Sequence, residues 1–511
     1  MKLFKAMATV GGLTGVSRVF GFVRDVLTAA VLGAGPIADA FFVALKLPNF
    51  FRRVTAEGAF SVAFVPLYSE TLEKEGRGAA DSFAGNAFMV MFSVLSVLTF
   101  LAILGMPYVI AAIAPGFAGD AVRFDAAVEF SRITFPYLLL MSLTALLGGV
   151  LNALGRFAPF AFAPVLFNVC LIAALFLAGR FENAGLALSY GILAAGCLQL
   201  VWLVFCARRA GVRLCPRVPK IDVRVRRVFA LMGPGVIGAG VMHINLFADM
   251  IIASFLDGGS ISYLYYADRL NQLPLGVVGI AVGTALLPML SSAIARGDAD
   301  EARGLFNRAL EICLLLALPA AAALMVMPET LIHVLFERGR FTAADTDVTA
   351  MVLQCYAVGL PAYIAIKVFS TAHWARQDTV TPVKISVVAT VLNIVLSLVL
   401  IRFIGVAGIA LATGLTGWLQ FGAHIYVLQY KEGGLPVVRF DERFLRAAVK
   451  IVGASVAMAA VVFGLDGFLE QGIVQLAVIV AAGMAVYGAL ILGMGVVDRQ
   501  RLKNILKPQK S

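Results

Sequence analysis

Long apolar segments, each about the length of a membrane-spanning helix, run through the whole sequence. A helix that crosses a bilayer needs about 20 mostly apolar residues. By that criterion the 511-residue chain contains about fourteen spans, at 8–32, 37–67, 86–111, 128–154, 159–179, 186–207, 228–255, 262–293, 306–327, 348–372, 380–401, 405–429, 446–464 and 473–495. Only 14% of its residues are charged, against about 25% in soluble domains, so the sequence predicts an all-α polytopic membrane protein.

The positive charge lies mostly on one side of these spans. Most of the 41 Lys and Arg residues fall in loops on the side of the N-terminus, including a cluster at 208–227. Basic residues gather in cytoplasmic loops, so both termini are predicted to be cytoplasmic, and the net charge of +11 needs no nucleic-acid partner. Residues 1–32 are predicted to be a first spanning helix and not a cleaved signal peptide, because charged residues interrupt their apolar stretch.

The sequence contains an internal repeat with an offset of about 224 residues. Six landmarks recur in order: Asp25, Gly35, Pro48, Pro66, Phe117 and Pro136 return as Asp249, Gly259, Pro274, Pro288, Phe341 and Pro361. Six spans per copy is an even number, so both copies insert the same way up. This predicts two six-helix lobes related by a pseudo-two-fold axis along the membrane normal, at 1–210 and 211–430, with two extra C-terminal helices and a basic cytoplasmic tail at 431–511.

Several basic residues lie inside the first two predicted spans. A charged side chain costs about 2.5–3.5 kcal/mol at the bilayer centre, so a group of arginines facing lipid would cost roughly 10 kcal/mol. We therefore expect Arg18, Arg24 and Arg52 to face a water-filled cavity for an anionic substrate. Arginine suits a pyrophosphate, because its planar fork binds two oxygens and keeps its charge. Other charged residues fit either a supporting role in that cavity or ion pairs within the lobe: Asp25, Asp39, Lys46, Arg53 and Glu57.

The second lobe carries isolated charges of its own. Arg269, next to Asp268 on the eighth span, could complete a basic ring from the opposite side, and Lys367 on the tenth span is another intramembrane cation. Three polar residues on the seventh span could bind Na⁺ or a proton, or could equally form hydrogen bonds between helices: His243, Asn245 and Asp249.

No catalytic or metal-binding pattern is evident in the sequence. The six cysteines and four histidines are scattered, with no spacing typical of a metal site and no arrangement of nucleophile, base and orienting group. The sequence therefore predicts a protein that is not an enzyme, with no metal and no cofactor. The energy source stays open between the membrane potential, Na⁺ and H⁺.

Specific stretches resemble a known family. The segment SRVFGFVRDVLTAAVLGAGPIADAFFVALKLPNFFRRVTAEGAFSVAFVPLYSE (17–70) is similar to the N-terminal signature of the MurJ (MviN) family, which are lipid II flippases of the multidrug/oligosaccharidyl-lipid/polysaccharide exporter superfamily. YYADRLNQLPLGVVGIAVGTALLPMLS (265–291), FERGRFT (336–342) and ARQDTVTPVKI (375–385) resemble the same family. The resemblance covers essentially the whole chain and is weakest in the last two spans.

The resemblance implies a substrate and a site. The substrate is lipid II, undecaprenyl-pyrophosphate carrying a disaccharide-pentapeptide, which would cross from the cytoplasmic to the periplasmic leaflet of the bacterial inner membrane by alternating access. The last two helices would hold the lipid tail, and cell-wall synthesis proteins are possible partners. The family's important positions match Arg18, Arg24, Arg52 and Arg269 in the cavity, together with Asp39, Asp268 and Lys367; Gln272 stands where some members are acidic.

Other functions remain open at this point. The nearest alternative is a flippase for another prenyl-linked glycan, such as an O-antigen or capsule unit. A basic cavity disfavours an ion-coupled small-molecule exporter, and a scaffold without transport would leave the intramembrane arginines unexplained.

Overall fold

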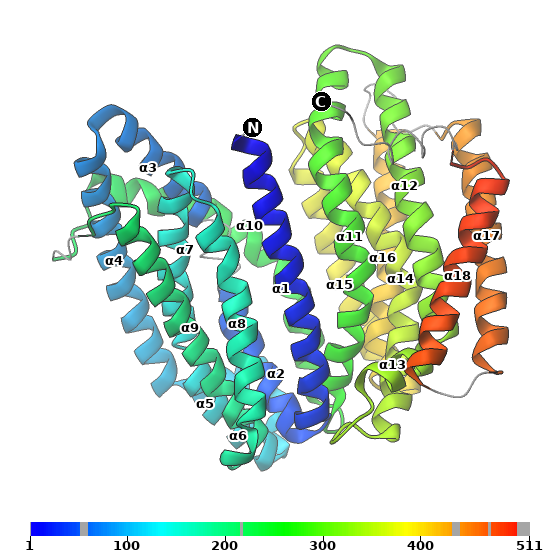
Figure 1. Cartoon of the computed structure of the whole chain (residues 1–511), viewed down its shortest axis with the longest axis horizontal. Coiled ribbons are helices and arrows are strands. Elements are labelled where there is room, and N and C mark those ends of the chain that lie inside the picture. Colours follow the sequence, from blue (N-terminus) through cyan, green and yellow to red (C-terminus); the bar gives the residue numbers. More distant parts are fainter. Residues whose placement is uncertain (1, 52–59, 215–217, 432–439, 469–471, 498–511) are drawn as a thin grey trace. The chain divides into compact units, whose positions relative to one another are not determined.

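The computed structural model describes residues 2–51, 60–214, 218–431, 440–468 and 472–497, and in these segments the chain forms helices and no strand (Figure 1). Nine helices in this part of the chain are long and apolar enough to cross a membrane. The predicted class, an all-α polytopic membrane protein, is therefore confirmed, whereas the number of fourteen spans stays a prediction. The predicted span 128–154 consists of two helices, which meet at Pro136, a residue with no backbone N–H to donate.

The described chain divides into two compact units, residues 1–262 with 338–341 and residues 263–337 with 342–511. The lobes predicted from the repeat have other boundaries and stay a prediction. Unit 1 contains α1 (Lys2–Leu32), α2 (Pro36–Phe51), α3 (Ser61–Glu75), α4 (Arg77–Leu104), α5 (Met106–Ile113), η2 (Pro115–Gly119), α6 (Ala121–Thr134), α7 (Tyr137–Ala153), α8 (Ala158–Phe176), η3 (Ala178–Arg180), α9 (Ala184–Arg209) and α10 (Val223–Ser254). Unit 2 contains nearly all of α11 (Ser260–Ala295), then α12 (Ala299–Val326), α13 (Pro328–Phe336), α14 (Ala343–Ala375), α15 (Val380–Ile404), α16 (Ala407–Tyr426), η4 (Val427–Lys431), α17 (Glu442–Asp466) and α18 (Ile473–Gly493).

In unit 1, α8 packs between α1 and α9, and α2 packs on α6. Aromatic side chains fill the contact of α3 with α4, where the ring of Phe64 stacks on Tyr68 and Phe83 at centroid distances of 5.9 and 5.3 Å. All three rings are buried. Burying side chains of this size gives roughly 1.5–3 kcal/mol each in water, and inside a membrane the same close fit contributes through packing contacts.

In unit 2, α14 lies between α12 and α16, and α15 packs on α16 (Figure 1). Two glycines bring α14 and α16 into close contact, since a Cβ added to Gly359 would lie 2.5 Å from the Cα of Gly414. Side chains then tie each helix to the backbone of the other. Tyr363 donates its hydroxyl to the Thr413 carbonyl at 2.9 Å, and the Trp418 indole donates to the Val358 carbonyl at 2.9 Å. Small residues that allow close approach are the usual device of helix pairs in membranes.

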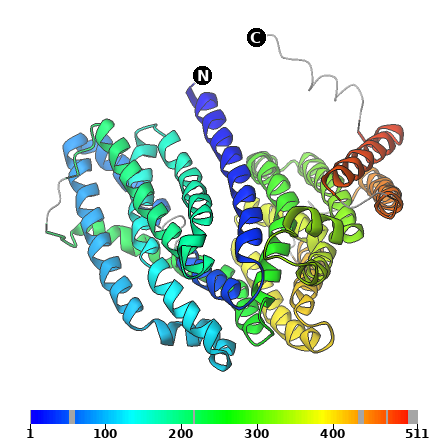
Figure 2. The same ribbon diagram turned by 60° about the horizontal axis from the view of Figure 1, so that its bottom comes forward.

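The last two helices, α17 and α18, lie side by side in both views and pack as a pair, with α17 against α12 (Figures 1 and 2). Tyr487 of α18 donates its hydroxyl to the Leu315 carbonyl of α12 at 2.7 Å. Thr330 of α13 donates to the Asp466 carboxylate at the end of α17, at 2.6 Å. The pair outside the sequence repeat is thus fixed to unit 2 by its ends as well as by its apolar faces.

Two contacts in unit 1 follow the register of the repeat, and we call them the paired loop contacts. The Gly116 N–H donates to Ser254 Oγ at 3.0 Å, and the Arg340 N–H donates to the Ala30 carbonyl at 2.8 Å. Gly116 and Arg340 are 224 positions apart, as are Ala30 and Ser254. Each copy of the repeat therefore uses the same loop position to hold the end of the first helix of the other copy.

Candidate functional site

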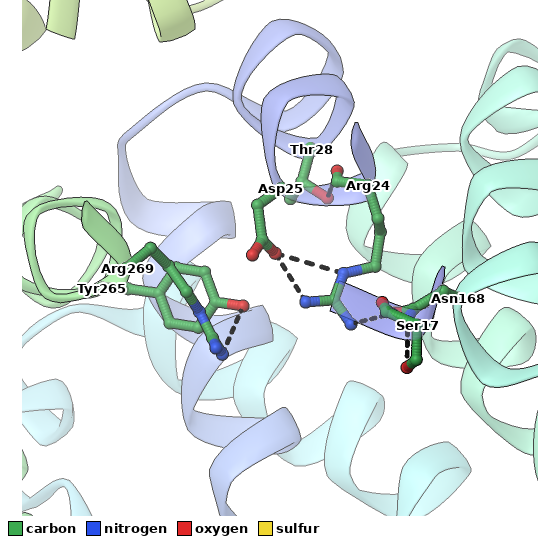
Figure 3. Close-up of polar contacts among 7 residues, drawn as sticks. All are labelled: Ser17, Arg24, Asp25, Thr28, Asn168, Tyr265 and Arg269. Atoms are coloured by element: carbon green, nitrogen blue, oxygen red, sulfur yellow. Dashed lines mark hydrogen bonds and ion pairs between the residues drawn. The ribbon is translucent and has the colours of Figure 1, made fainter. Parts of the chain in front are cut away.

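Arg24 on α1 is the centre of a polar cluster in unit 1 (Figure 3). Its guanidinium donates to Asp25 Oδ1 from Nε at 3.1 Å and from Nη2 at 2.6 Å, and to Asn168 Oδ1 from Nη1 at 2.9 Å. The Asn168 amide in turn donates to the Ser17 carbonyl at 2.9 Å, so α8 holds α1 at two positions that are about two helical turns apart. The Arg24 side chain is only 12% exposed, so the cluster fixes its orientation.

Other residues of α1 and α8 lie around the Arg24 cluster. Gly21 lies one turn before Arg24 and beside Asn168, since a Cβ at that position would be in ordinary van der Waals contact with the Asn168 amide nitrogen, at 3.5 Å. Thr28, one turn later, donates its hydroxyl to the Arg24 carbonyl at 2.8 Å. The Phe167 ring lies 5.8 Å from the guanidinium carbon, a cation–π distance. The helix pair therefore surrounds the Arg24 guanidinium with polar partners and one aromatic ring.

Arg269 on α11 is the corresponding basic group of unit 2 (Figure 3). Its guanidinium carbon lies 4.6 Å from the centre of the Tyr265 ring, and Nη2 donates to the Tyr265 hydroxyl at 3.0 Å. The next turn holds a second polar contact, in which the Gln272 amide donates to the Asp268 carboxylate. Gln272 thus binds Asp268 without adding a negative charge of its own.

Asp39 lies at the start of α2, fully buried, and binds the start of α11. One carboxylate oxygen accepts from the Ser262 N–H at 2.8 Å and the Ser262 hydroxyl at 2.6 Å, and the other accepts from the Gly259 N–H at 2.8 Å. A carboxylate at this place satisfies N–H groups that the first turn of a helix leaves without partners and also complements its dipole. Asp39 therefore has a structural role, in which it holds the start of α11 to the start of α2. Its role as a charged residue of a cavity stays a prediction.

The other predicted site residues lie as follows. Arg18 and Lys367 are exposed on α1 and α14, and Lys46 is partly buried on α2. Asn245 donates to Asp249 on α10 at 3.5 Å, a long hydrogen bond within one helix. Arg52, Arg53 and Glu57 lie outside the described residues, and the description of His243 does not extend to its side chain.

Sequence reasoning missed two parts of the site. It did not predict the partner of Arg24, which binds its neighbour in the chain, Asp25, directly. It also passed over Asn168, which lies in the apolar stretch of 159–179. A polar residue in a predicted span is by itself a signal of function, and that signal could have identified Asn168.

The described residues show no group of three or more His, Cys, Asp or Glu side chains that could hold a metal ion. The chemistry that the two arginine clusters offer is the binding of an anion, since guanidinium groups oriented by fixed partners are well suited to phosphate oxygens.

Comparison with known proteins decides the family. The sequence profile of the family described as "Lipid II flippase MurJ" matches residues 28–483. The chain belongs to the MurJ family of lipid II flippases. A MurJ relative from Rhizobium meliloti (strain 1021), named a probable lipid II flippase, is 42% identical over 99% of this chain and 97% of its own length. A MurJ relative from Burkholderia cenocepacia, named a lipid II flippase, is 36% identical over 97% of each chain.

Solved structures agree with the MurJ assignment. A structure titled "Lipid II flippase MurJ, inward closed conformation" superposes with a TM-score of 0.80 at 26% identity, and covers 98% of this chain and 99% of that one. An inward-facing multidrug transporter of the MATE family, in the MOP superfamily, superposes with a TM-score of 0.68 at 12% identity over 86% of this chain and 96% of its own. The second likeness concerns the fold alone. Together they show that this MurJ family member has the helical fold of both structures.

Proposed function

We propose that this protein moves lipid II from the cytoplasmic to the periplasmic leaflet of the bacterial inner membrane. The observation that carries the proposal is the family match, which extends over 28–483 and includes the whole of α11, where Arg269 lies. Arg24 lies four residues before the start of that match. The bilayer and lipid II are the partners that this function requires. Both termini are then cytoplasmic, as the distribution of basic residues predicts.

In this proposal Arg24 and Arg269 bind the pyrophosphate of lipid II, with Arg18 and Arg52 completing the basic cavity. Asp25 and Asn168 hold the Arg24 guanidinium in place, and the Tyr265 ring and hydroxyl do the same for Arg269. Preorganised donors of this kind lose little conformational entropy when an anion arrives.

Transport proceeds by alternating access, with the prenyl chain remaining in lipid beside α17 and α18. An inside-negative potential favours the outward movement of a pyrophosphate, at about 2.3 kcal/mol per charge per 100 mV. Coupling to Na⁺ or H⁺ through Asn245 and Asp249, together with His243, is a further part of the proposal. Proteins of cell-wall synthesis are expected partners, since they make and use lipid II.

The arginine site is tested by replacing the native gene with variants in cells that depend on it. Arg24→Lys keeps the charge but loses the planar fork, and Arg269→Gln removes the charge; both should fail to support growth at normal protein levels. Arg402→Gln changes an arginine in the last turn of α15 that is a member of neither cluster, and should support growth. Normal growth with Arg24→Lys and Arg269→Gln would exclude the proposed pyrophosphate site.

A further inference from the structure

A groove of about 650 Å³ runs between α15 and α16 of unit 2. Its floor is aliphatic and includes Ile385, Val388, Ala389 and Leu392. Polar groups are confined to Thr381 and Lys384 in the first turns of α15 and to Gln420 on α16. The groove is thus polar where α15 begins and apolar along the rest of its length.

The dimensions of the groove match one leaflet of a bilayer. Thr381 and Leu392 are eleven residues apart on one helix, which corresponds to about 16 Å at 1.5 Å per residue. Half of the hydrocarbon core of a bilayer is about 15 Å thick. An acyl chain that enters beside Lys384 could therefore lie along the floor as far as Leu392.

Lys384 supplies a positive charge at the polar end. Its side chain is exposed, and in the part of the chain that the structure describes no carboxylate forms an ion pair with it. The nearby Asp378 carboxylate, in the turn between α14 and α15, is held by the His373 ring at 3.0 Å and by the Val380 and Thr381 N–H groups at 3.1 and 3.0 Å. A lysine at a helix end with an unneutralised charge is complementary to a lipid phosphate.

The two copies of the repeat differ at this groove. In unit 1, α1 covers a face of α8, through Ser17, Arg24 and Asn168. The counterpart of α1 in the repeat is α10, which packs on α3, α4 and η2, and α15 packs on α16 with only a marginal contact to α14. Valines and leucines along α15, such as Val388 at 60% exposed, are accordingly left uncovered within unit 2.

We propose that this groove binds an anionic phospholipid of the cytoplasmic leaflet, with its phosphate at Lys384 and one acyl chain along the aliphatic floor. The side assignment uses the predicted topology, in which the turn 376–379 is cytoplasmic, and anionic lipids enrich that leaflet. The binding does not require that the protein transport lipid II, so this proposal and the proposed function stand or fall separately.

Native mass spectrometry of the full-length protein in detergent tests the proposal, with phosphatidylglycerol and phosphatidylcholine as probes. Lys384→Gln should lower phosphatidylglycerol binding several-fold and leave phosphatidylcholine binding unchanged. Val388→Trp fills the groove with a large side chain. It should lower phosphatidylglycerol binding, because the acyl chain of that lipid lies there. Arg402→Gln, at the opposite end of the same helix, is the matched control and should bind phosphatidylglycerol as the native protein does.

Three results would overturn the proposal. The first is equal binding of the two lipids by the native protein, which would remove the role of the headgroup charge. The second is undiminished phosphatidylglycerol binding by Lys384→Gln, and the third is undiminished binding by Val388→Trp in a variant whose thermal unfolding shows that it is folded.

Discussion

The contact of Arg340 with Ala30 can be tested by adding a single methyl group at Gly339. Gly339 has a φ of 62°, and a Cβ there would lie 2.2 Å from the Ala30 carbonyl oxygen, a backbone atom that cannot rotate away. Gly297 is a matched control, because its φ is 73° and nothing lies within 4 Å of its Cβ position. Both alanine variants share the cost of a left-handed backbone, about 1 kcal/mol.

Gly339→Ala has a second cost, since the loop must move and lose the Arg340 N–H to Ala30 carbonyl hydrogen bond of 2.8 Å. Leaving a buried N–H and carbonyl without partners costs about 1–3 kcal/mol. Gly339→Ala should therefore lower the free energy of unfolding by roughly 2–4 kcal/mol, and Gly297→Ala should lower it by about 1 kcal/mol. Thermal unfolding in detergent measures the difference as a Tm several degrees lower for Gly339→Ala. Hydrogen exchange should show that the Arg340 amide loses its protection in this variant alone. Equal Tm values, with the Arg340 amide protected in both, would refute the reasoning.

Three further predictions test other parts of the structure. Asp39→Ala removes the hydrogen bonds that Asp39 accepts from Gly259 and Ser262 and should cost about 3–5 kcal/mol, whereas Ser262→Ala, which loses the hydroxyl contact alone, should cost about 1. Denaturant titration in detergent compares the two variants, and equal costs would contradict the assigned contacts. His424→Phe should raise the Tm by a few degrees, because His424 is fully buried and neither ring nitrogen has a hydrogen-bond partner in the described chain; a lower Tm would show that the imidazole has a stabilising partner. Burial would raise the pKa of Asp378, but hydrogen bonds from its neighbours outweigh this and lower it to about 2, so the native protein should lose stability as the pH falls from about 5 towards 2. Asp378→Asn should lack this acid-dependent part of the Tm profile, and identical profiles would exclude the assignment.

The sequence allowed the fold class to be predicted because the bilayer restricts a spanning chain to a few solutions, and apolar length is a direct signal of a spanning helix. It also allowed the internal repeat to be predicted, and the paired loop contacts of Gly116 and Arg340 keep its register of 224 residues. It could not show that α10 packs with the helices of unit 1, since a helix with an apolar surface can pack on several partners and its choice depends on shape.

The candidate site was predictable only in part, for a similar reason. Charge inside a span identified Arg24 and Arg269, because the cost of burying arginine in lipid is a property of the residue itself. Partner choice depends on side-chain direction, which the sequence does not show, and the ion pair of Arg24 with Asp25 at 2.6 Å was therefore not predicted. Asp39 shows the same limit: its charge was evident, but its contacts with a segment 220 residues away depend on the tertiary fold.

The central claim is that this protein moves lipid II across the membrane, and the leaflet distribution of lipid II tests it most directly. Cells would be depleted of the protein and supplied with either the native chain or Arg24→Ala, and lipid II exposed on the outer surface would be measured. The account predicts that exposure is lost on depletion, restored by the native chain and not restored by Arg24→Ala at equal protein levels. Normal exposure of lipid II in depleted cells that contain no second flippase would contradict it.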